Sequence, residues 1–253
     1  MSRIVCAWYT PDYAKWADGL AASCRQVGES FDLIAVEKRT GGWESETQRK
    51  PLMVRDALLK HGDKDLIVFV DVDATVEKPL DELQRSFRGD IGLYCRARVR
   101  TRRQIFFRSG TIALTPGEHT SAFIDAWCVE AGQSEYGTVD QDSLLRAVEC
   151  ATSATLQMLP IAYCATKHDI ENGHVAIERV AILHEQASFT STQKESWLSK
   201  RTRRLVSALK GGEGLITSTR GSFSASRMIR KTVLWRAVKS WKSYLSVKWW
   251  PRI

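Results

Sequence analysis

The chain has 253 residues, of which 43% are hydrophobic and 26% are charged, a composition that excludes wholesale disorder and fibrous architectures. Its formal net charge of +8 is unevenly divided, since residues 200–253 carry +13 and residues 1–199 carry −5. Such a basic end favours a polyanionic partner, either a membrane or a nucleic acid. The sequence has no apolar run near the roughly 20 residues that span a bilayer and no secretion signal at its start, so we expect a cytoplasmic protein.

The first 73 residues alternate between strand and helix patterns. In chain order they predict a strand at 3–9, a helix ending near 28, a strand at 31–37, a helix at 51–62 and a strand at 65–73. The last strand contains five successive apolar residues, Leu66 to Val70, as expected of a strand that is buried on both faces. This order predicts an α/β fold with a mostly parallel sheet flanked by helices.

Further elements follow before the composition changes. They are a helix at 79–88, strands at 91–95 and 105–115, a helix that starts at the capping-box sequence 115–118 and runs through Trp127, a helix at 140–148, and short strands near 155–160 and 175–184. After about Ser188 the sequence becomes rich in Ser, Thr, Lys and Arg. We therefore expect a globular domain over residues 1–190 and a basic, Trp-rich helical tail over residues 191–253.

Two carboxylates, Asp71 and Asp73, follow the buried strand. Alternation along a strand puts both on one face, at the carboxyl edge where open α/β sheets bind ligands. They form a hard oxygen site of the kind that holds Mg²⁺ or Mn²⁺. Asp-x-Asp also occurs at 63/65 and 140/142, and what distinguishes 71/73 is the buried strand before it. The alternative is a pair of aspartates that cap the end of the strand.

The segment around these aspartates resembles a known family. LIVFVDVDATV, preceded by a helix and followed by KPLDEL, is similar to the Asp-x-Asp segment of nucleotide-diphospho-sugar transferases of the GT-A fold, in particular bacterial lipopolysaccharide glycosyltransferases. The resemblance continues in order through AWYT (7–10), QRKP (48–51), RSGTIAL (108–114) and VDQDSLLRAV (139–148), and covers about residues 3–185. It implies a GT-A-like, Rossmann-like catalytic domain over residues 1–190 that binds a nucleotide sugar, with a uridine diphosphate sugar as the expected donor.

The resemblance also implies roles for individual residues. The donor-binding residues would be Ala7, Trp8, Tyr9, Thr10, Lys50, Asp71, Ser109 and Gly110. Asp71, Asp73 and His184 would hold Mn²⁺ or Mg²⁺, which acts as a Lewis acid for the departing nucleoside diphosphate. The Gly, Lys and Trp that usually follow such a His are absent here. A solvated Lys50 is the alternative to a phosphate contact.

A second group, Asp140, Gln141 and Asp142, opens a predicted helix. In the resembling enzymes this position contacts the transferred sugar or the acceptor, and an Asp there can act as general base. By that resemblance Asp140 is the preferred base. The alternative is that the aspartates cap the helix and interact with its dipole. Arg108 stands where the family has Asn before the Ser-Gly pair, which leaves the identity of donor or acceptor open.

Arginines alternate with other residues after the strand at 91–95. Arg96, Arg98 and Arg100 would share one face of an extended segment. Their guanidinium groups would bind an anionic acceptor or the donor diphosphate, because they can pair with phosphates and carboxylates through two hydrogen bonds. The alternative is a solvated loop.

The tail contains an amphipathic pattern at residues 231–247. Its apolar stripe, with Lys and Arg off the stripe, consists of Leu234, Val238, Trp241 and Leu245. This pattern predicts a helix that lies on anionic lipid at the inner face of the cytoplasmic membrane. Docking on the globular domain and binding of nucleic acid are the alternatives.

Together these features favour a metal-dependent glycosyltransferase, peripheral to the membrane, that transfers a sugar to an anionic glycan or lipid-linked envelope acceptor. One alternative is a glycosyltransferase that acts on modified nucleic acid. Another is a non-catalytic nucleotide-binding or membrane-adaptor relative. The sequence has no G-x-G-x-x-G after its first strand and no G-x-x-x-x-G-K-[ST], which argues against a Rossmann dehydrogenase and a P-loop kinase.

Overall fold

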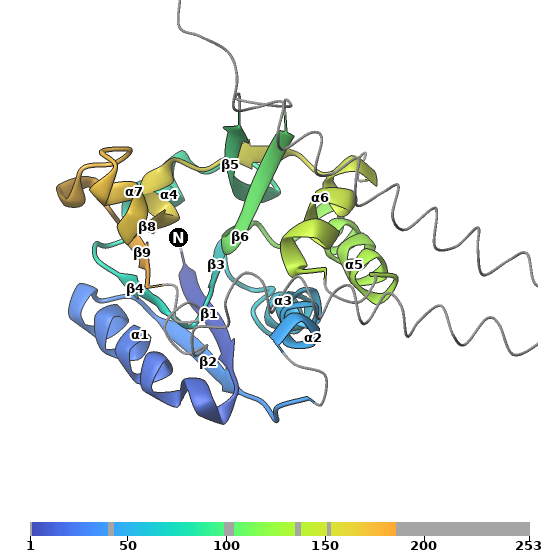
Figure 1. Ribbon diagram of the computed structural model, residues 1–253, viewed down its shortest axis with the longest axis horizontal. Helices are drawn as coiled ribbons and strands as arrows, with labels where there is room; N and C mark the ends of the chain where they lie inside the picture. The colour runs from blue at the N-terminus through green and yellow to red at the C-terminus, as the bar shows by residue number, and fades with distance from the viewer. Residues whose placement is uncertain (1, 40–42, 99–103, 135–137, 151–152, 186–253) are drawn as a thin grey trace, which may run out of the picture. The chain divides into compact units, whose positions relative to one another are not determined.

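The computed structural model describes residues 2–39, 43–98, 104–134, 138–150 and 153–185 (Figure 1). The expected basic tail at 191–253 lies outside these residues, as does Arg100. A helical tail and its contact with a membrane therefore stay predictions.

A six-stranded sheet forms the centre of the fold, with the strand order β2-β1-β3-β6-β5-β7 (Figure 1). Its strands are β1 (Arg3–Tyr9), β2 (Phe31–Ala35), β3 (Leu66–Val70), β5 (Ile91–Arg98), β6 (Gln104–Leu114) and β7 (Leu156–Met158). Five of the six run in one direction, and β6 is antiparallel to both of its neighbours. The predicted mainly parallel sheet is confirmed, with one reversed strand that the sequence pattern did not indicate.

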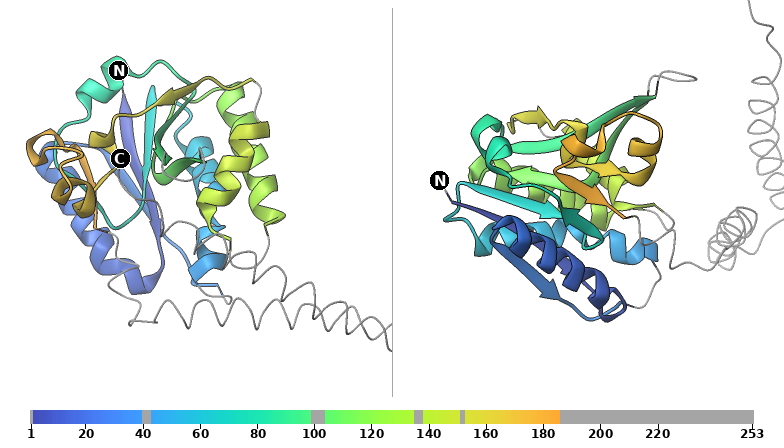
Figure 2. Two further views of the ribbon diagram at one scale, coloured as in Figure 1. Left: turned by 45° about the horizontal axis from the view of Figure 1, so that its top comes forward. Right: turned by 90° about the vertical axis from the view of Figure 1, so that its left-hand side faces the viewer.

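Helices cover both faces of this sheet (Figure 1 and Figure 2). One face packs against α1 (Ala14–Val27), and the other against α3 (Lys50–Lys60), α5 (Glu118–Gly132) and α6 (Asp140–Cys150). Side chains alternate between the two cores, since Val5 and Val68 lie in the core with α1 whereas Cys6 and Phe69 lie in the core with the other three helices. Both faces of β3 are thus buried, as its run of apolar residues predicted.

A second, three-stranded sheet begins directly after β3. It has the order β4-β9-β8, formed by β4 (Ala74–Val76), β9 (Ile182–His184) and β8 (Ala165–Thr166). The strands expected at 65–73 and 175–184 are both shorter than predicted, because a turn follows Val70 and a 3₁₀ helix, η3 (Ile177–Arg179), precedes β9. Asp71 and Asp73 consequently lie between the two sheets.

Short helices complete the described part of the fold. They are η1 (Pro11–Tyr13), α2 (Trp43–Thr47), α4 (Asp81–Ser86), η2 (Ile161–Tyr163) and α7 (Lys167–Glu171). Thr166 and Asp169 form a capping box at the start of α7, in which each side chain accepts a hydrogen bond from the backbone N–H of the other. No helix within the described ranges is long and apolar enough to cross a bilayer.

β5 and β6 form a two-stranded ribbon that continues past the end of β3 (Figure 2). β3 pairs with residues 111–114 of β6, whereas β5 pairs with β6 as far as Arg98 and Gln104. A register shift between Leu93 and Tyr94 separates the two parts of the ribbon. Arg96 and Arg98 therefore lie in an extended segment, as predicted, although the side chain of Arg98 is outside the described part of the chain.

Candidate functional site

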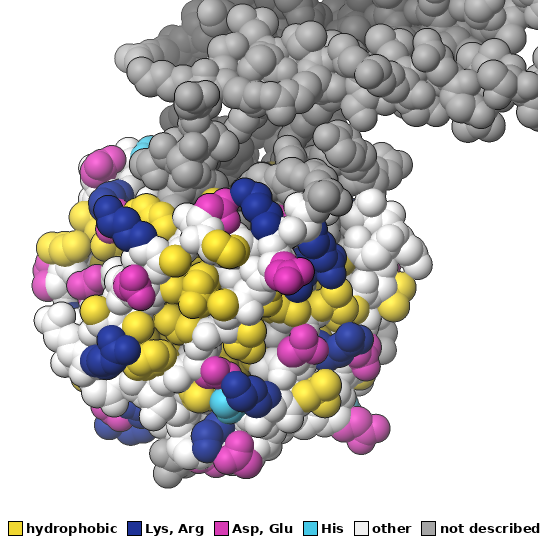
Figure 3. Space-filling model, turned by 90° about the horizontal axis from the view of Figure 1, so that it is seen from below, with side chains coloured by type: hydrophobic (Ala, Val, Ile, Leu, Met, Phe, Trp, Pro, Cys, Tyr) yellow, Lys and Arg dark blue, Asp and Glu magenta, His cyan; other side chains and the backbone are white. Residues whose placement is uncertain are grey.

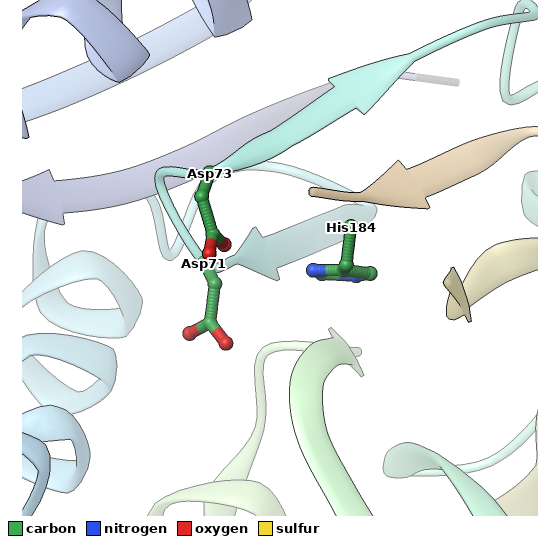
Figure 4. A group of neighbouring side chains, drawn as sticks. All are labelled: Asp71, Asp73 and His184. Carbon is green, nitrogen blue, oxygen red and sulfur yellow. The ribbon is translucent and has the colours of Figure 1, made fainter. Parts of the chain in front are cut away.

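Asp71, Asp73 and His184 come together between the two sheets (Figure 4). Asp71 directly follows β3, Asp73 is two residues further on, and His184 ends β9. One ligand atom from each lies within 4.8 Å of the other two, and the imidazole points toward the carboxylates (Figure 4). The backbone fixes both acidic residues, since Asp71 N–H donates to Gly110 O (2.8 Å) and Glu185 N–H donates to Asp73 O (2.9 Å). The three residues expected to hold a metal thus converge on one small region.

Gly110 leaves space beside this group. A Cβ atom at position 110 would lie 3.0 Å from His184 Cε1, 3.2 Å from His184 Nδ1 and 3.4 Å from Asp71 Oδ2. The missing side chain therefore keeps open the space between the imidazole and the carboxylate. Two carboxylates and one imidazole around such a space fit a divalent cation, and the imidazole favours Mn²⁺ over Mg²⁺, which prefers oxygen ligands.

His184 is held as a neutral imidazole. It is 5% exposed, and its Nε2 lies 2.9 Å from Thr111 Oγ1. Burial, together with the charges of Lys50 and Arg108, lowers the pKa of His184 to about 3. When Nε2–H donates to the Thr111 hydroxyl, the lone pair remains on Nδ1, the nitrogen that faces Gly110. This is the protonation state that metal ligation requires.

Lys50, the first residue of α3, forms ion pairs with both Asp71 and Asp140. Its Nζ lies 2.7 Å from Asp71 Oδ1 and 2.5 Å from Asp140 Oδ2, and it donates to Ser109 Oγ at 3.2 Å. Burial opposes the charge of Lys50, but the two carboxylates outweigh burial and raise its pKa. Lys50 is only 6% exposed, so the alternative of a solvated Lys50 is wrong. Its charge keeps two acidic side chains close together.

The three residues that open α6 have different surroundings. Asp140 is 4% exposed and pairs with Lys50, whereas Gln141 and Asp142 are exposed. Asp142 Oδ2 accepts a hydrogen bond from Val139 N–H (3.0 Å), so Asp142 caps the helix, which was the alternative to a catalytic role. Catalytic roles for Asp140, Gln141 and Asp142 stay predictions. Of the three, only Asp140 is linked through Lys50 to the metal-ligand group, which consists of Asp71, Asp73 and His184.

The residues expected to bind the donor at the end of β1 alternate between the two cores. Ala7 and Tyr9 pack on the side of α1, whereas Trp8 packs on the opposite side. The Arg49 guanidinium lies 5.9 Å from the centroid of a Trp8 ring, and Thr10 Oγ1 donates to the Asp12 carboxylate. The contribution of these residues to donor binding stays a prediction.

Arg108 makes an ion pair that the sequence pattern did not reveal. Its Nη1 and Nη2 donate to Asp169 Oδ2 and Oδ1 at 2.5 and 3.0 Å, and its guanidinium lies over the Tyr94 ring, 5.0 Å from the centroid. Asp169 also accepts hydrogen bonds from Thr166, which pairs with His184 across β8 and β9. Arg108 and Asp169 therefore tie β6 to the strand beside His184.

We expect Asp169→Asn to lower the free energy of unfolding by about 2 kcal/mol, because it leaves the Arg108 guanidinium without its carboxylate. The melting temperature should fall by about 4–8 °C for a domain of this size. Glu171→Gln, in the same helix and exposed, is the matched control and should leave the melting temperature unchanged. Equal melting temperatures for Asp169→Asn and the control would contradict the structural role of the ion pair.

No family model matches the sequence, and no curated protein matches it in sequence. Solved structures match in fold. A glycosyltransferase involved in the glycosylation of the major capsid of PBCV-1 is 10% identical, with a TM-score of 0.56 over 74% of this chain and 95% of that chain. The galactosyltransferase LgtC, in complex with donor and acceptor sugar analogues, is 13% identical, with a TM-score of 0.50 over 86% of this chain and 97% of that chain. The chain has the GT-A fold. At these identities the similarity establishes the GT-A fold alone.

Proposed function

We propose that this GT-A chain is a metal-dependent glycosyltransferase. It would move a sugar from a nucleoside-diphosphate donor, expected to be a uridine diphosphate sugar, to a glycan or lipid-linked envelope acceptor. The observation that carries the proposal is the convergence of Asp71, Asp73 and the neutral His184 around the space at Gly110. Mn²⁺ or Mg²⁺ bound there would neutralise the negative charge that builds on the departing diphosphate.

The chain's own residues support this site. Lys50 pairs with Asp71, Thr111 fixes the ring of His184, and Gly110 leaves room for a ligand. These contacts position the ligand atoms before the donor arrives, so little reorganisation is needed on binding. Asp140 adjoins the same ion pair, which supports it as the residue that contacts the transferred sugar.

The acceptor is proposed to be a saccharide, and the LgtC complex with an acceptor sugar analogue supports this class. Attachment to the inner face of the cytoplasmic membrane through residues 191–253 is part of the same proposal. The described residues give no specific support for a nucleic-acid acceptor.

Thermal unfolding with a panel of nucleoside-diphosphate sugars, each with and without Mn²⁺, tests the proposed donor. A ligand at 100 times its dissociation constant stabilises the native state by about 2.7 kcal/mol, so the melting temperature should rise by about 5–10 °C for the correct donor. The rise should require Mn²⁺ and disappear with EDTA. The proposal is contradicted if no nucleotide sugar stabilises the protein in the presence of Mn²⁺.

Cation binding should weaken below neutral pH. Burial, together with the neighbouring carboxylates of Asp73 and Asp140, raises the pKa of Asp71 to about 7 despite the opposing charge of Lys50. A proton and a cation compete for this carboxylate, so the affinity for Mn²⁺ should fall about tenfold for each pH unit below 7. Calorimetric titrations of Mn²⁺ between pH 5 and pH 8 measure this dependence, and an affinity that stays constant over this range would rule it out.

A further inference from the structure

One face of the β5–β6 ribbon lies beside α7. The opposite face packs into the core, where Cys95 and Phe107 contact the cluster that includes α5 and α6. Tyr94 pairs with Arg108, and Arg96 pairs with Phe106, so these four side chains share the face toward α7. Phe106 is 39% exposed on this face. The ribbon runs past the end of β3 (Figure 2), so this face continues outward from the metal-ligand group.

Positive charge exceeds negative charge on this face. Asp169 is already paired with Arg108 through two hydrogen bonds, and Arg96 Nη1 lies further from it, at 3.8 Å. Two guanidinium groups thus share one carboxylate. Arg96 has 37% of its side chain exposed, and its Nη2 lies 3.5 Å from His174 Nε2.

A cavity of about 360 Å³ adjoins His174. Its lining includes Ile161, Ala162, His174, Val175 and Arg179. The lining contains no acidic side chain, and Arg179 makes no ion pair with any described residue. Its volume lies at the lower end of the range for small-molecule sites, and apolar walls with a few polar groups are typical of such sites.

Hydrogen bonds join the segments that line the cavity to the small sheet that ends in His184. His174 N–H donates to Asp169 O (2.9 Å), and the Asp169 side chain accepts from Thr166, the partner of His184 in the small sheet. On the other wall, Ala181 N–H, just before β9, donates to Ala162 O (2.8 Å). Two segments that line the cavity are thus hydrogen-bonded to residues next to β8 and β9, the strands of the sheet that carries His184.

Another face of the molecule lacks the excess of positive charge that the ribbon face shows. Seen from below, acidic and basic side chains are interspersed around hydrophobic ones (Figure 3). An anion gains from a site where positive groups outnumber negative ones, and guanidinium groups pair with carboxylates and phosphates with high specificity.

We propose that this cavity, together with Arg96 and Phe106 on the ribbon, is the acceptor subsite and that it binds a sugar carrying a carboxylate or a phosphate. Arg96 and Arg179 recognise the charged group, and Phe106 with the apolar walls contacts the sugar ring. This inference rests on the proposed glycosyltransferase function, and it specifies the charge of the acceptor that the reaction takes.

This subsite is tested by titrating the full chain with three matched sugars and measuring each dissociation constant by NMR. The probes are methyl β-glucuronide, methyl β-glucoside 6-phosphate and the neutral methyl β-glucoside. We expect at least one charged sugar to bind about tenfold more tightly than the glucoside, as for a charge-assisted hydrogen bond. Which of the two charged sugars binds more tightly identifies the anionic group.

Arg96→Gln and Arg179→Gln should each reduce this preference to about threefold or less. Arg85→Gln, an exposed arginine of α4, is the matched control and should retain the preference. The melting temperatures of all three variants show whether they are folded. Arg96 lies 3.8 Å from Asp169, so its replacement could disturb that residue, and Arg179→Gln tests the cavity without changing Arg96. Equal binding of all three sugars to the wild-type protein, or a preference that survives in both Arg96→Gln and Arg179→Gln, overturns the inference.

A titration of the wild-type protein with uridine diphosphate and Mn²⁺ separates this inference from the proposed function. Failure of the nucleotide to bind contradicts the proposed donor, whereas the comparison of charged and neutral sugars decides the acceptor subsite independently. Binding of both the nucleotide and the charged sugar supports both proposals.

Discussion

We expect Asp73→Asn to lower the rate of donor turnover by about 10²-fold or more. The amide keeps the size of the side chain but removes a negative ligand from the group formed with Asp71 and His184. Stabilisation of a leaving diphosphate by a bound cation contributes several kcal/mol, and each 1.4 kcal/mol corresponds to about a factor of ten in rate. Hydrolysis or transfer of the donor that is active in the thermal screen, measured over a range of Mn²⁺ concentrations, gives this ratio.

The chain contains a matched control for this substitution. Asp63 belongs to another Asp-x-Asp sequence, which precedes β3 instead of following it, and 70% of its side chain is exposed. Asp63→Asn should retain wild-type turnover and the same dependence on Mn²⁺. If Asp73→Asn also retains full activity, the assignment of the metal site is wrong.

Replacing Lys50 by Met destabilises the fold by about 3–5 kcal/mol. Lys50 Nζ is the cation between the Asp71 and Asp140 carboxylates, and Asp140 is almost fully buried. Without it, two acidic groups face each other in a region where unpaired charge is costly. The melting temperature should fall by about 6–20 °C, measured by calorimetry or circular dichroism.

Lys15→Met tests whether this loss is specific to the buried ion pair. Lys15 is exposed in α1 and makes no ion pair with any residue that the structure describes, so its replacement should change the melting temperature little. Wild-type stability of Lys50→Met would show that the Asp71 and Asp140 carboxylates do not depend on this cation.

The sequence predicts the central part of the fold because its signals there are local. The apolar run from Leu66 to Val70 indicates a strand that is buried on both faces, and the alternating strands and helices before it indicate parallel pairing. Both predictions are confirmed. The acidic pair that follows is also where the resemblance to the GT-A family indicated a metal site, and the structure brings His184 beside it.

Other parts of the site depend on contacts between distant residues, which leave no periodic pattern. Arg108 and Asp169 are 61 positions apart, and nothing in the neighbourhood of either residue indicates the other. β8 has two residues and α7 has five, too few for an apolar pattern to repeat. For the same reason, the predicted strand at 65–73 includes the turn after Val70, and the three-residue strand β4 has no pattern that predicts it.

The two aspartates at the start of α6 show where a local signal is ambiguous. An Asp at a helix start serves as a cap or as a reactive group, and both readings fit the same sequence. The structure distinguishes the two residues by burial, because Asp142 caps the helix from the surface whereas Asp140 lies inside, paired with Lys50. Burial is set by tertiary packing, which the two residues do not encode by themselves.

Crystals soaked in Mn²⁺, with anomalous diffraction data, test the metal site most directly. We expect an anomalous peak at coordination distance from the carboxylates of Asp71 and Asp73 and from His184 Nδ1, in the space that Gly110 leaves open. The same experiment with Asp73→Asn should show a weaker peak or none. A protein that needs Mn²⁺ for donor turnover but binds it elsewhere would contradict the assignment of the metal site to Asp71, Asp73 and His184.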